Sequence, residues 1–174
     1  MAQPSGRIIQ MGAVVGDIST GKILDRFRLH INPDEQLSDY IVKLTGITQE
    51  QVDNGVSLRE GYAQLCDFHA RHGSFCNVIT WGGGDVEEIR KQMHEAYGSE
   101  STQSWPFGRR WIDAKTIWVS YRLAKGEPIQ GGLAKSMTKV GLQFIGRKHD
   151  AQDDAENTFR MYLAMLKLLN SERG

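Results

Sequence analysis

The chain has 174 residues, of which 40% are hydrophobic and 24% charged, and its 21 basic and 21 acidic side chains cancel to a formal net charge of zero. This length suits one globular domain with a sizeable core. The charge balance excludes a broad polybasic surface, so any contact with nucleic acid must be local. The sequence shows no signal region and no apolar run long enough to span a bilayer, which predicts a cytoplasmic protein.

Two cysteines, Cys66 and Cys76, are too few for a disulfide framework or a zinc site. A single bridge between them is the alternative. We expect two small buried thiols in a reducing compartment.

The first part of the chain predicts a β-hairpin followed by short helices. Residues Ile8–Val15 form a nearly continuous apolar run, and Ile23–Ile31 alternate apolar and polar side chains after a turn. Three helical segments are then expected, at Leu37–Leu44, after the capping box Thr48–Gln51, and from the capping box Ser57–Glu60 to about Arg71.

The second part alternates strands and helices. Strands are expected at Phe75–Trp81 and Trp111–Ile112. Helices are expected from Asp85, from an Asp113 cap to Leu123, at Leu133–Val140 and at Asp150–Leu169. This order indicates one α/β domain over residues 1–174, with a mixed β-sheet flanked by helices.

Two acidic positions carry the chemical signal. Asp85 follows a strand and three glycines, and its simplest interpretation is a helix N-cap. Glycines at a strand end also let a ligand approach the backbone closely. Asp154 lies on the first turns of the last helix at the edge of the core, with His149 just before that helix. Together these three residues indicate a carboxylate metal site beside a histidine.

Five stretches of the sequence resemble the DEDDh-type 3′-5′ exonucleases, the superfamily of proofreading exonucleases, oligoribonuclease and RNase T. They are IIQMGAVV, NPDEQLSDYIVKLTGITQEQVD, TWGGGDVEEI, WPFGRRWIDAKTIW and GLQFIGRKHDAQDDAENT. The spacing from His149 to Asp154 is that of the superfamily's final motif, and the nearest likeness is to the histone-mRNA 3′ exonuclease branch. The resemblance covers nearly the whole chain and implies a ribonuclease H-like fold.

The resemblance also implies an activity, the metal-dependent removal of nucleotides from the 3′ ends of single-stranded RNA or DNA. Such enzymes hold two divalent cations about 4 Å apart, and hard oxygen ligands suit Mg²⁺ or Mn²⁺. Carried across by motif, Asp85 and Asp154 are metal ligands and His149 is the general base. The other acids of the last motif are interpreted as an acidic helix start facing the positive end of the helix dipole: Asp150, Asp153 and Glu156.

One departure from the family concerns its first motif, Asp-x-Glu, on the strand before the one that matches IIQMGAVV. The residues upstream, MAQPSGR, contain no acid, and neither Asp17 nor Asp25 has a glutamate two positions on. Two of the four expected carboxylates and one strand of the sheet are therefore missing, and neighbouring strands lose backbone partners. The alternatives are a fragment or mis-started version of a longer active enzyme, a naturally inert relative, and a gap filled by another chain or a rearranged segment.

Candidate substrate contacts lie near the motifs. Leu44 and Ile47 of the LTGIT segment and Trp81 beside the glycines are candidates for base contacts, with a core role as the alternative; Arg147 is a candidate for phosphate. The branch favours RNA slightly over DNA, and relatives are sometimes homodimers; no membrane partner is expected. The competing hypothesis is a catalytically inert nucleic-acid-binding or scaffolding relative of the same fold. A calcium loop is disfavoured because HDAQDDAENT lacks the central glycine of an EF-hand.

Overall fold

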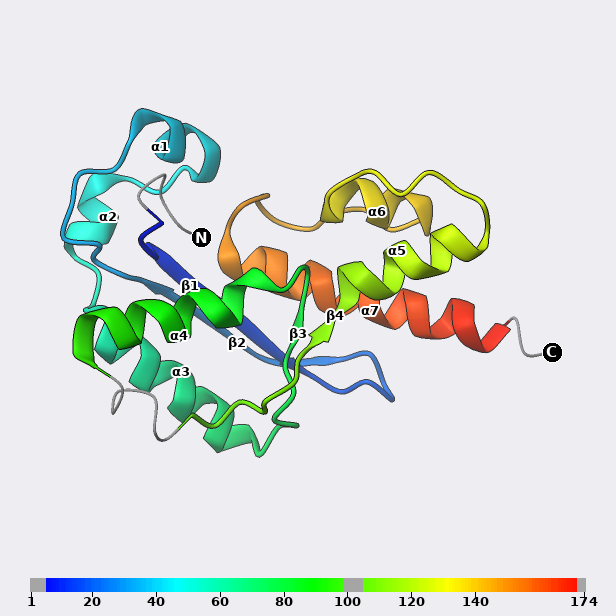
Figure 1. Cartoon of the computed structure of the whole chain (residues 1–174), viewed down its shortest axis with the longest axis horizontal. Helices are drawn as coiled ribbons and strands as arrows, with labels where there is room; N and C mark the ends of the chain where they lie inside the picture. The colour runs from blue at the N-terminus through cyan, green and yellow to red at the C-terminus, as the bar shows by residue number, and fades with distance from the viewer. Residues whose placement is uncertain (1–5, 99–104, 172–174) are drawn as a thin grey trace.

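The computed structural model describes residues 6–98 and 105–171, and this part of the chain folds into helices around two small sheets (Figure 1). The elements are β1 (Gln10–Gly16), β2 (Ile23–His30), α1 (Asp39–Thr45), α2 (Gln49–Asp53), α3 (Leu58–His72), β3 (Ile79–Thr80), α4 (Gly84–Tyr97), β4 (Ile112–Asp113), α5 (Ala114–Ala124), α6 (Leu133–Lys139) and α7 (Ala151–Ser171). The predicted order of elements is confirmed, with boundaries within a few residues for most of them.

The hairpin of β1 and β2 forms the centre of the fold. Its strands pair antiparallel, with Gln10 opposite His30. The connecting turn is closed where the Asp17 N–H donates to the Lys22 carbonyl at 2.9 Å. Exposure alternates along β2 as predicted, because successive side chains of a strand point to opposite faces.

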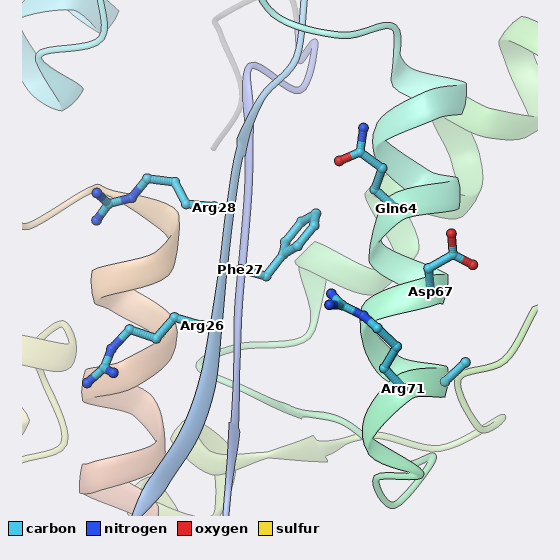
Figure 2. A pocket seen from close by; sticks show the side chains of 7 residues that line it. Arg26, Phe27, Arg28, Gln64, Asp67 and Arg71 are labelled. Carbon is cyan, nitrogen blue, oxygen red and sulfur yellow. The ribbon is translucent and has the colours of Figure 1, made fainter.

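Helices α3 and α7 cover opposite faces of this hairpin (Figure 2). On the α3 side, Met11 packs into an apolar cluster with side chains of that helix. On the α7 side, β1 presents Gly12 and Gly16. A Cβ at Gly12 would overlap the backbone of Ala151–Gln152, and one at Gly16 would overlap the ring of Phe159. The absence of a side chain at these two positions therefore sets how closely α7 approaches the sheet.

The second sheet is a short parallel pair, with Ile79 of β3 opposite Ile112 of β4. The α/β class is confirmed, but the described residues place the antiparallel and parallel pairs in two separate sheets. The predicted strand Phe75–Trp81 is too long, because only Ile79–Thr80 are in a strand. Within the described chain β3 pairs with β4 alone, and β4 is two residues long, so the ladder ends after two residues.

The shortened strand also changes the setting of one cysteine. Both Cys66 and Cys76 are free, as predicted, and Cys66 is partly buried. Cys76 is exposed, so the expectation that both thiols are buried is wrong. Cys76 lies in the irregular segment before β3, outside the ladder that would have carried it inward.

Side-chain caps define several helix starts. The predicted capping box at Thr48 is confirmed, since its side chain accepts from the Gln51 N–H while the Gln51 side chain accepts from the Thr48 N–H. Ser57 caps α3 through the Glu60 N–H, whereas the Glu60 carboxylate accepts a hydrogen bond from Gln64. These caps satisfy N–H groups that have no partner within their own helix.

The apolar side chains form three clusters. One joins β1 to α3 and α4, a second lies among α5, α6 and α7, and a third lies beneath α1 and α2. No helix of the described residues combines the length and apolar character needed to cross a membrane.

The Gly12 contact gives a stability prediction. We expect Gly12→Ala to lower the free energy of unfolding by about 3 kcal/mol, because the new methyl meets the backbone of α7, which cannot rotate aside. Urea denaturation measures the loss. The matched control is Gly132→Ala, where φ is −80° and no atom lies within 4 Å of the added Cβ. Equal midpoints for the two variants would contradict the close approach of α7 to β1.

Candidate active site

The site begins at the turn that leads into α7. His149 is exposed and has a φ of 68°, in the left-handed region that few non-glycine residues adopt. The Asp150 N–H donates to the Arg147 carbonyl at 3.2 Å and closes the turn. The backbone N–H of His149 lies near enough to the Asp154 carboxylate to lower its pKa. The two residues predicted to act together thus lie side by side at the start of α7.

Asp150 organises the start of α7. Its Oδ1 accepts hydrogen bonds from the Gln152 N–H at 3.1 Å and the Asp153 N–H at 3.0 Å, as an N-cap side chain does. The same oxygen accepts from Arg28 of β2 at 2.8 Å, and Oδ2 accepts from Gln10 of β1 at 2.9 Å. The Asp150 carboxylate therefore connects both strands of the hairpin to the helix that carries Asp154.

The acids of the site differ in their electrostatic setting. Burial raises the pKa of Asp154, although the His149 N–H and ring oppose the shift. Burial alone would also raise the pKa of Asp150, but hydrogen bonds from the Asp153 N–H, Gln10 and Arg28 lower it below its ordinary value. The hydrogen bond from Arg26 lowers the pKa of Glu156. Of these three acids at the start of α7, Asp154 is thus the one whose negative charge its neighbours compensate least.

Asp85 lies on the first turn of α4 and is not its N-cap. The cap position belongs to Gly83, which has no side chain to accept a hydrogen bond, so the capping interpretation is wrong. Asp85 is exposed to solvent, yet the protein packed around its carboxyl raises its pKa. Among the described residues, no hydrogen bond to the Asp85 carboxyl ties it to the end of α4.

Asp113 holds the loop before α4 in place. It caps α5 as predicted, accepting from the Lys115 N–H at 3.0 Å and the Thr116 N–H at 3.1 Å. Its Oδ1 also accepts from the Gly82 N–H at 3.0 Å. This bond ties the glycine segment that precedes Asp85 to the end of β4.

The predicted substrate contacts fall into two groups. Ile47 is 4% exposed and lies in the cluster beneath α1 and α2, with Leu44 packed beside it, which supports their core alternative. Trp81 packs partly buried against the cluster that includes α7. Arg147 is exposed, and its guanidinium lies directly over Gly46 of the LTGIT turn, where a Cβ would overlap it. The structure therefore brings the LTGIT turn next to the turn that carries His149.

Sequence reasoning missed the residues that hold this turn. Gln10 is the one polar residue in the apolar run Ile8–Val15 and is 2% exposed, a pattern that signals a buried hydrogen-bonding role. Arg28 gave no such signal, because a basic residue at an outward position of an alternating strand is ordinary. Asn157 is fully buried, and its amide hydrogen-bonds with both the N–H and the carbonyl of Ile145.

A groove of about 610 Å³ follows the outer edge of β2 and lies apart from these residues (Figure 2). It is lined by residues of β2 and α3. His149, Asp154 and Asp85 are not among its lining residues, so it is not the site described above.

The α/β fold, with one acid where a strand passes into a helix and a histidine–acid pair at the start of the last helix, has the layout of a DEDDh exonuclease domain. Residues 1–162 match the exonuclease family RNase T, and the chain belongs to this family. A crystal structure of the nuclease domain of 3′hExo, a DEDDh family member, bound to rAMP, superposes with a TM-score of 0.78 at 27% identity. That match covers 92% of this chain and 81% of the other, and it confirms the ribonuclease H-like fold.

Curated relatives show the same relationship. Human ERI1 exoribonuclease 2 is 28% identical over 190 residues, covering 94% of this chain, and the Drosophila melanogaster 3′-5′ exonuclease Snipper is 27% identical over 181 residues, covering 92%. The chain spans about a quarter of the length of the first of these (26%) and 61% of the second. A further solved relative, a 3′-exonuclease with 3′-end-specific recognition of the histone mRNA stem-loop, superposes with a TM-score of 0.78 at 25% identity, over 91% of this chain and 71% of the other.

The opposite pKa shifts of Asp154 and Asp150 predict opposite effects of the same substitution. In metal-free buffer at pH 7, we expect Asp154→Asn to raise the free energy of unfolding by about 1 kcal/mol and Asp150→Asn to lower it by a similar amount. A raised folded pKa means that ionised Asp154 costs stability above that pKa. A lowered folded pKa means that ionised Asp150 adds stability above its unfolded value of 3.8, which is lost as the pH falls through the folded value.

Urea denaturation at neutral and acidic pH measures both effects. Both differences should shrink at a pH below the folded pKa of each group, because a protonated carboxyl resembles an amide. A destabilised Asp154→Asn at pH 7 would show that the carboxylate is well compensated after all.

Proposed function

We propose that this chain is a 3′-5′ exonuclease domain that hydrolyses the terminal phosphodiester bond of single-stranded RNA or DNA with the help of divalent metal ions. The observation that carries the proposal is the placement of His149 beside Asp154 at the start of α7, close enough for the His149 N–H to lower the pKa of the Asp154 carboxyl. Membership of the exonuclease family and similarity to 3′-5′ exonucleases support it.

The acids proposed as metal ligands suit the role. Asp154 and Asp85 both have raised pKa values, and no lysine or arginine of the described residues forms an ion pair with either. A divalent cation would supply the missing positive charge, and carboxylate oxygens suit Mg²⁺ or Mn²⁺. In the described part of the chain no three acids, histidines or cysteines lie close enough to hold a metal ion. Asp154 and Asp85 therefore represent a partial ligand set.

Bound metal ions would supply the charge that stabilises the hydrolytic transition state. His149 is placed to take a proton from the attacking water, since its ring is exposed on a closed turn and a neutral imidazole nitrogen accepts a proton. His149 lies next to Asp154, so the proposed base is close to the proposed metal ligand. That proximity is what positioning a nucleophile requires.

Substrate would reach the site past the LTGIT turn. Arg147, lying over Gly46, is the described basic residue best placed to contact a phosphate of the departing 3′ nucleotide or its neighbour. Trp81, which precedes Asp85 by four residues, offers an aromatic surface near the same strand end. RNA is the preferred substrate class in this proposal, because a solved relative is described as recognising the 3′ end of the histone mRNA stem-loop.

A second candidate function is a nucleic-acid-binding or scaffolding domain without catalysis. The specific observation in its favour is the incomplete ligand set among the described residues. It would retain Arg147 and the fold but would bind a 3′ end without cleaving it.

The deciding experiment is a degradation assay on 5′-labelled single-stranded RNA and DNA with Mn²⁺. We expect a ladder of products shortened from the 3′ end, abolished by EDTA and reduced more than about 100-fold by Asp154→Asn, which removes a ligand charge. His149→Ala should reduce the rate with little effect on binding of labelled RNA. The matched control is Asp67→Asn, an exposed acid of α3 outside the site.

The outcomes separate the two candidates. A ladder that persists in EDTA or in Asp154→Asn would contradict the proposed mechanism. Tight binding of labelled RNA with no cleavage by the unmodified chain would favour the binding domain instead.

A further inference from the structure

Side-chain hydrogen bonds hold the turn that carries His149 at three places. At its start, the Asn157 amide accepts from the Ile145 N–H at 3.0 Å and donates to the Ile145 carbonyl at 2.7 Å. In the middle, the Arg147 N–H donates to Asp153 Oδ2 at 2.7 Å. At its end, Asp150 caps the helix. All three fastening side chains belong to α7 or its cap, so the turn depends on how those side chains are held.

Asp153 also packs directly against the backbone of the turn. Its carboxylate occupies the space where Gly146 would carry a Cβ, and Gly146 has a φ of 81°. A glycine is thus required next to Asp153, and the carboxylate fits against the backbone of the turn. Any shift of Asp153 would release the Arg147 N–H and move the turn two residues before His149.

Arg28 of β2 joins Asp153 to Asp150. Its Nη2 donates to Asp150 Oδ1 at 2.8 Å and to Asp153 Oδ1 at 3.0 Å, so one nitrogen bridges two carboxylates. The side chains of Asp150 and Asp153 are only 14% and 19% exposed, which limits screening of their mutual repulsion by water. Figure 2 shows Arg28 reaching from β2 toward α7, on the side of the strand opposite Phe27.

We propose that Arg28 is a positioning residue for His149, acting through Asp150 and Asp153; this deepens the proposed function and rests on it for the role of His149. The guanidinium neutralises two acids that would otherwise repel each other across the first turn of α7. With that charge removed, Asp153 moves away from Asp150, the Arg147 N–H loses its acceptor, and the turn loses the conformation that places His149 beside Asp154. The His149 imidazole then adopts several positions relative to Asp154.

The chain contains a matched control for this idea. Arg26 lies two residues earlier on the same face of β2 and pairs with Glu156 of α7 at 2.7 Å. The exposure of the Arg26 side chain is 49%, close to the 41% of Arg28. The two ion pairs thus join the same strand to the same helix, and only the Arg28 pair touches the turn. A general weakening of the β2–α7 contact would affect both variants equally.

The experiment compares Arg28→Gln with Arg26→Gln in the full chain by amide hydrogen exchange and by nuclease kinetics. We expect the Arg147 and His149 amides to exchange about tenfold faster in Arg28→Gln, with shifted amide resonances for the turn, and to be unchanged in Arg26→Gln. We also expect kcat on single-stranded RNA to fall about tenfold in Arg28→Gln with KM within about twofold. Arg28→Lys should restore most of the loss, because a single nitrogen makes both contacts and an ammonium can reproduce them.

Equal exchange of the turn amides in the two glutamine variants would overturn the proposal. So would a fall of kcat in Arg28→Gln that is matched by Arg26→Gln. If the unmodified chain cleaves no RNA, the proposed function fails, and the exchange comparison alone still decides whether Arg28 positions the turn.

Discussion

The Asp150 carboxylate is the interaction on which the rest of this site depends. It accepts from β1 through Gln10, from β2 through Arg28 and from two N–H groups of the first turn of α7. The Gln10 amide completes the connection by accepting from the Ala151 N–H at 2.8 Å. Because these bonds join segments about 120 to 140 residues apart in sequence, they fix the start of α7 against the hairpin. Any residue that has to be placed by α7, Asp154 included, takes its position from this contact.

The hydrogen bonds between the hairpin and the start of α7 can form only because α7 packs closely against β1. Gly12 and Gly16 bring the backbone of α7 against β1, so that Gln10 can reach the first turn of the helix. A larger residue at either position would lift the helix and lengthen the hydrogen bonds that Asp150 accepts from Gln10 and Arg28. Hydrogen bonds weaken steeply with distance and angle, so packing and polar contacts support each other here.

Sequence reasoning succeeded where the information is local and failed where it is not. The hairpin, the Thr48 capping box, the Asp113 cap and the His149–Asp154 spacing all depend on residues within a few positions of one another. The length of the strand before Trp81 depends on which strands lie beside it, and Asp85 looked like a cap only because its backbone conformation was unknown. Asp150, Asp153 and Glu156 were interpreted as an acidic helix start, and nothing in the sequence indicated that arginines of β2 more than a hundred residues away pair with all three. Periodicity places Arg26 and Arg28 on one face of a strand, but it does not say which helix covers that face.

The acids of the candidate site fall into two groups, according to whether neighbouring groups compensate their negative charge. Asp150 and Glu156 have partners that lower their pKa values, so their charges add to the stability of the fold at neutral pH. Asp154 and Asp85 are held with raised pKa values, which costs stability. A fold selected for stability alone would replace such acids with neutral side chains. Retaining both acids at this cost fits the role of metal ligand that we propose for them. The paired acids join the start of α7 to the hairpin, and this gives Asp154 a defined place next to His149.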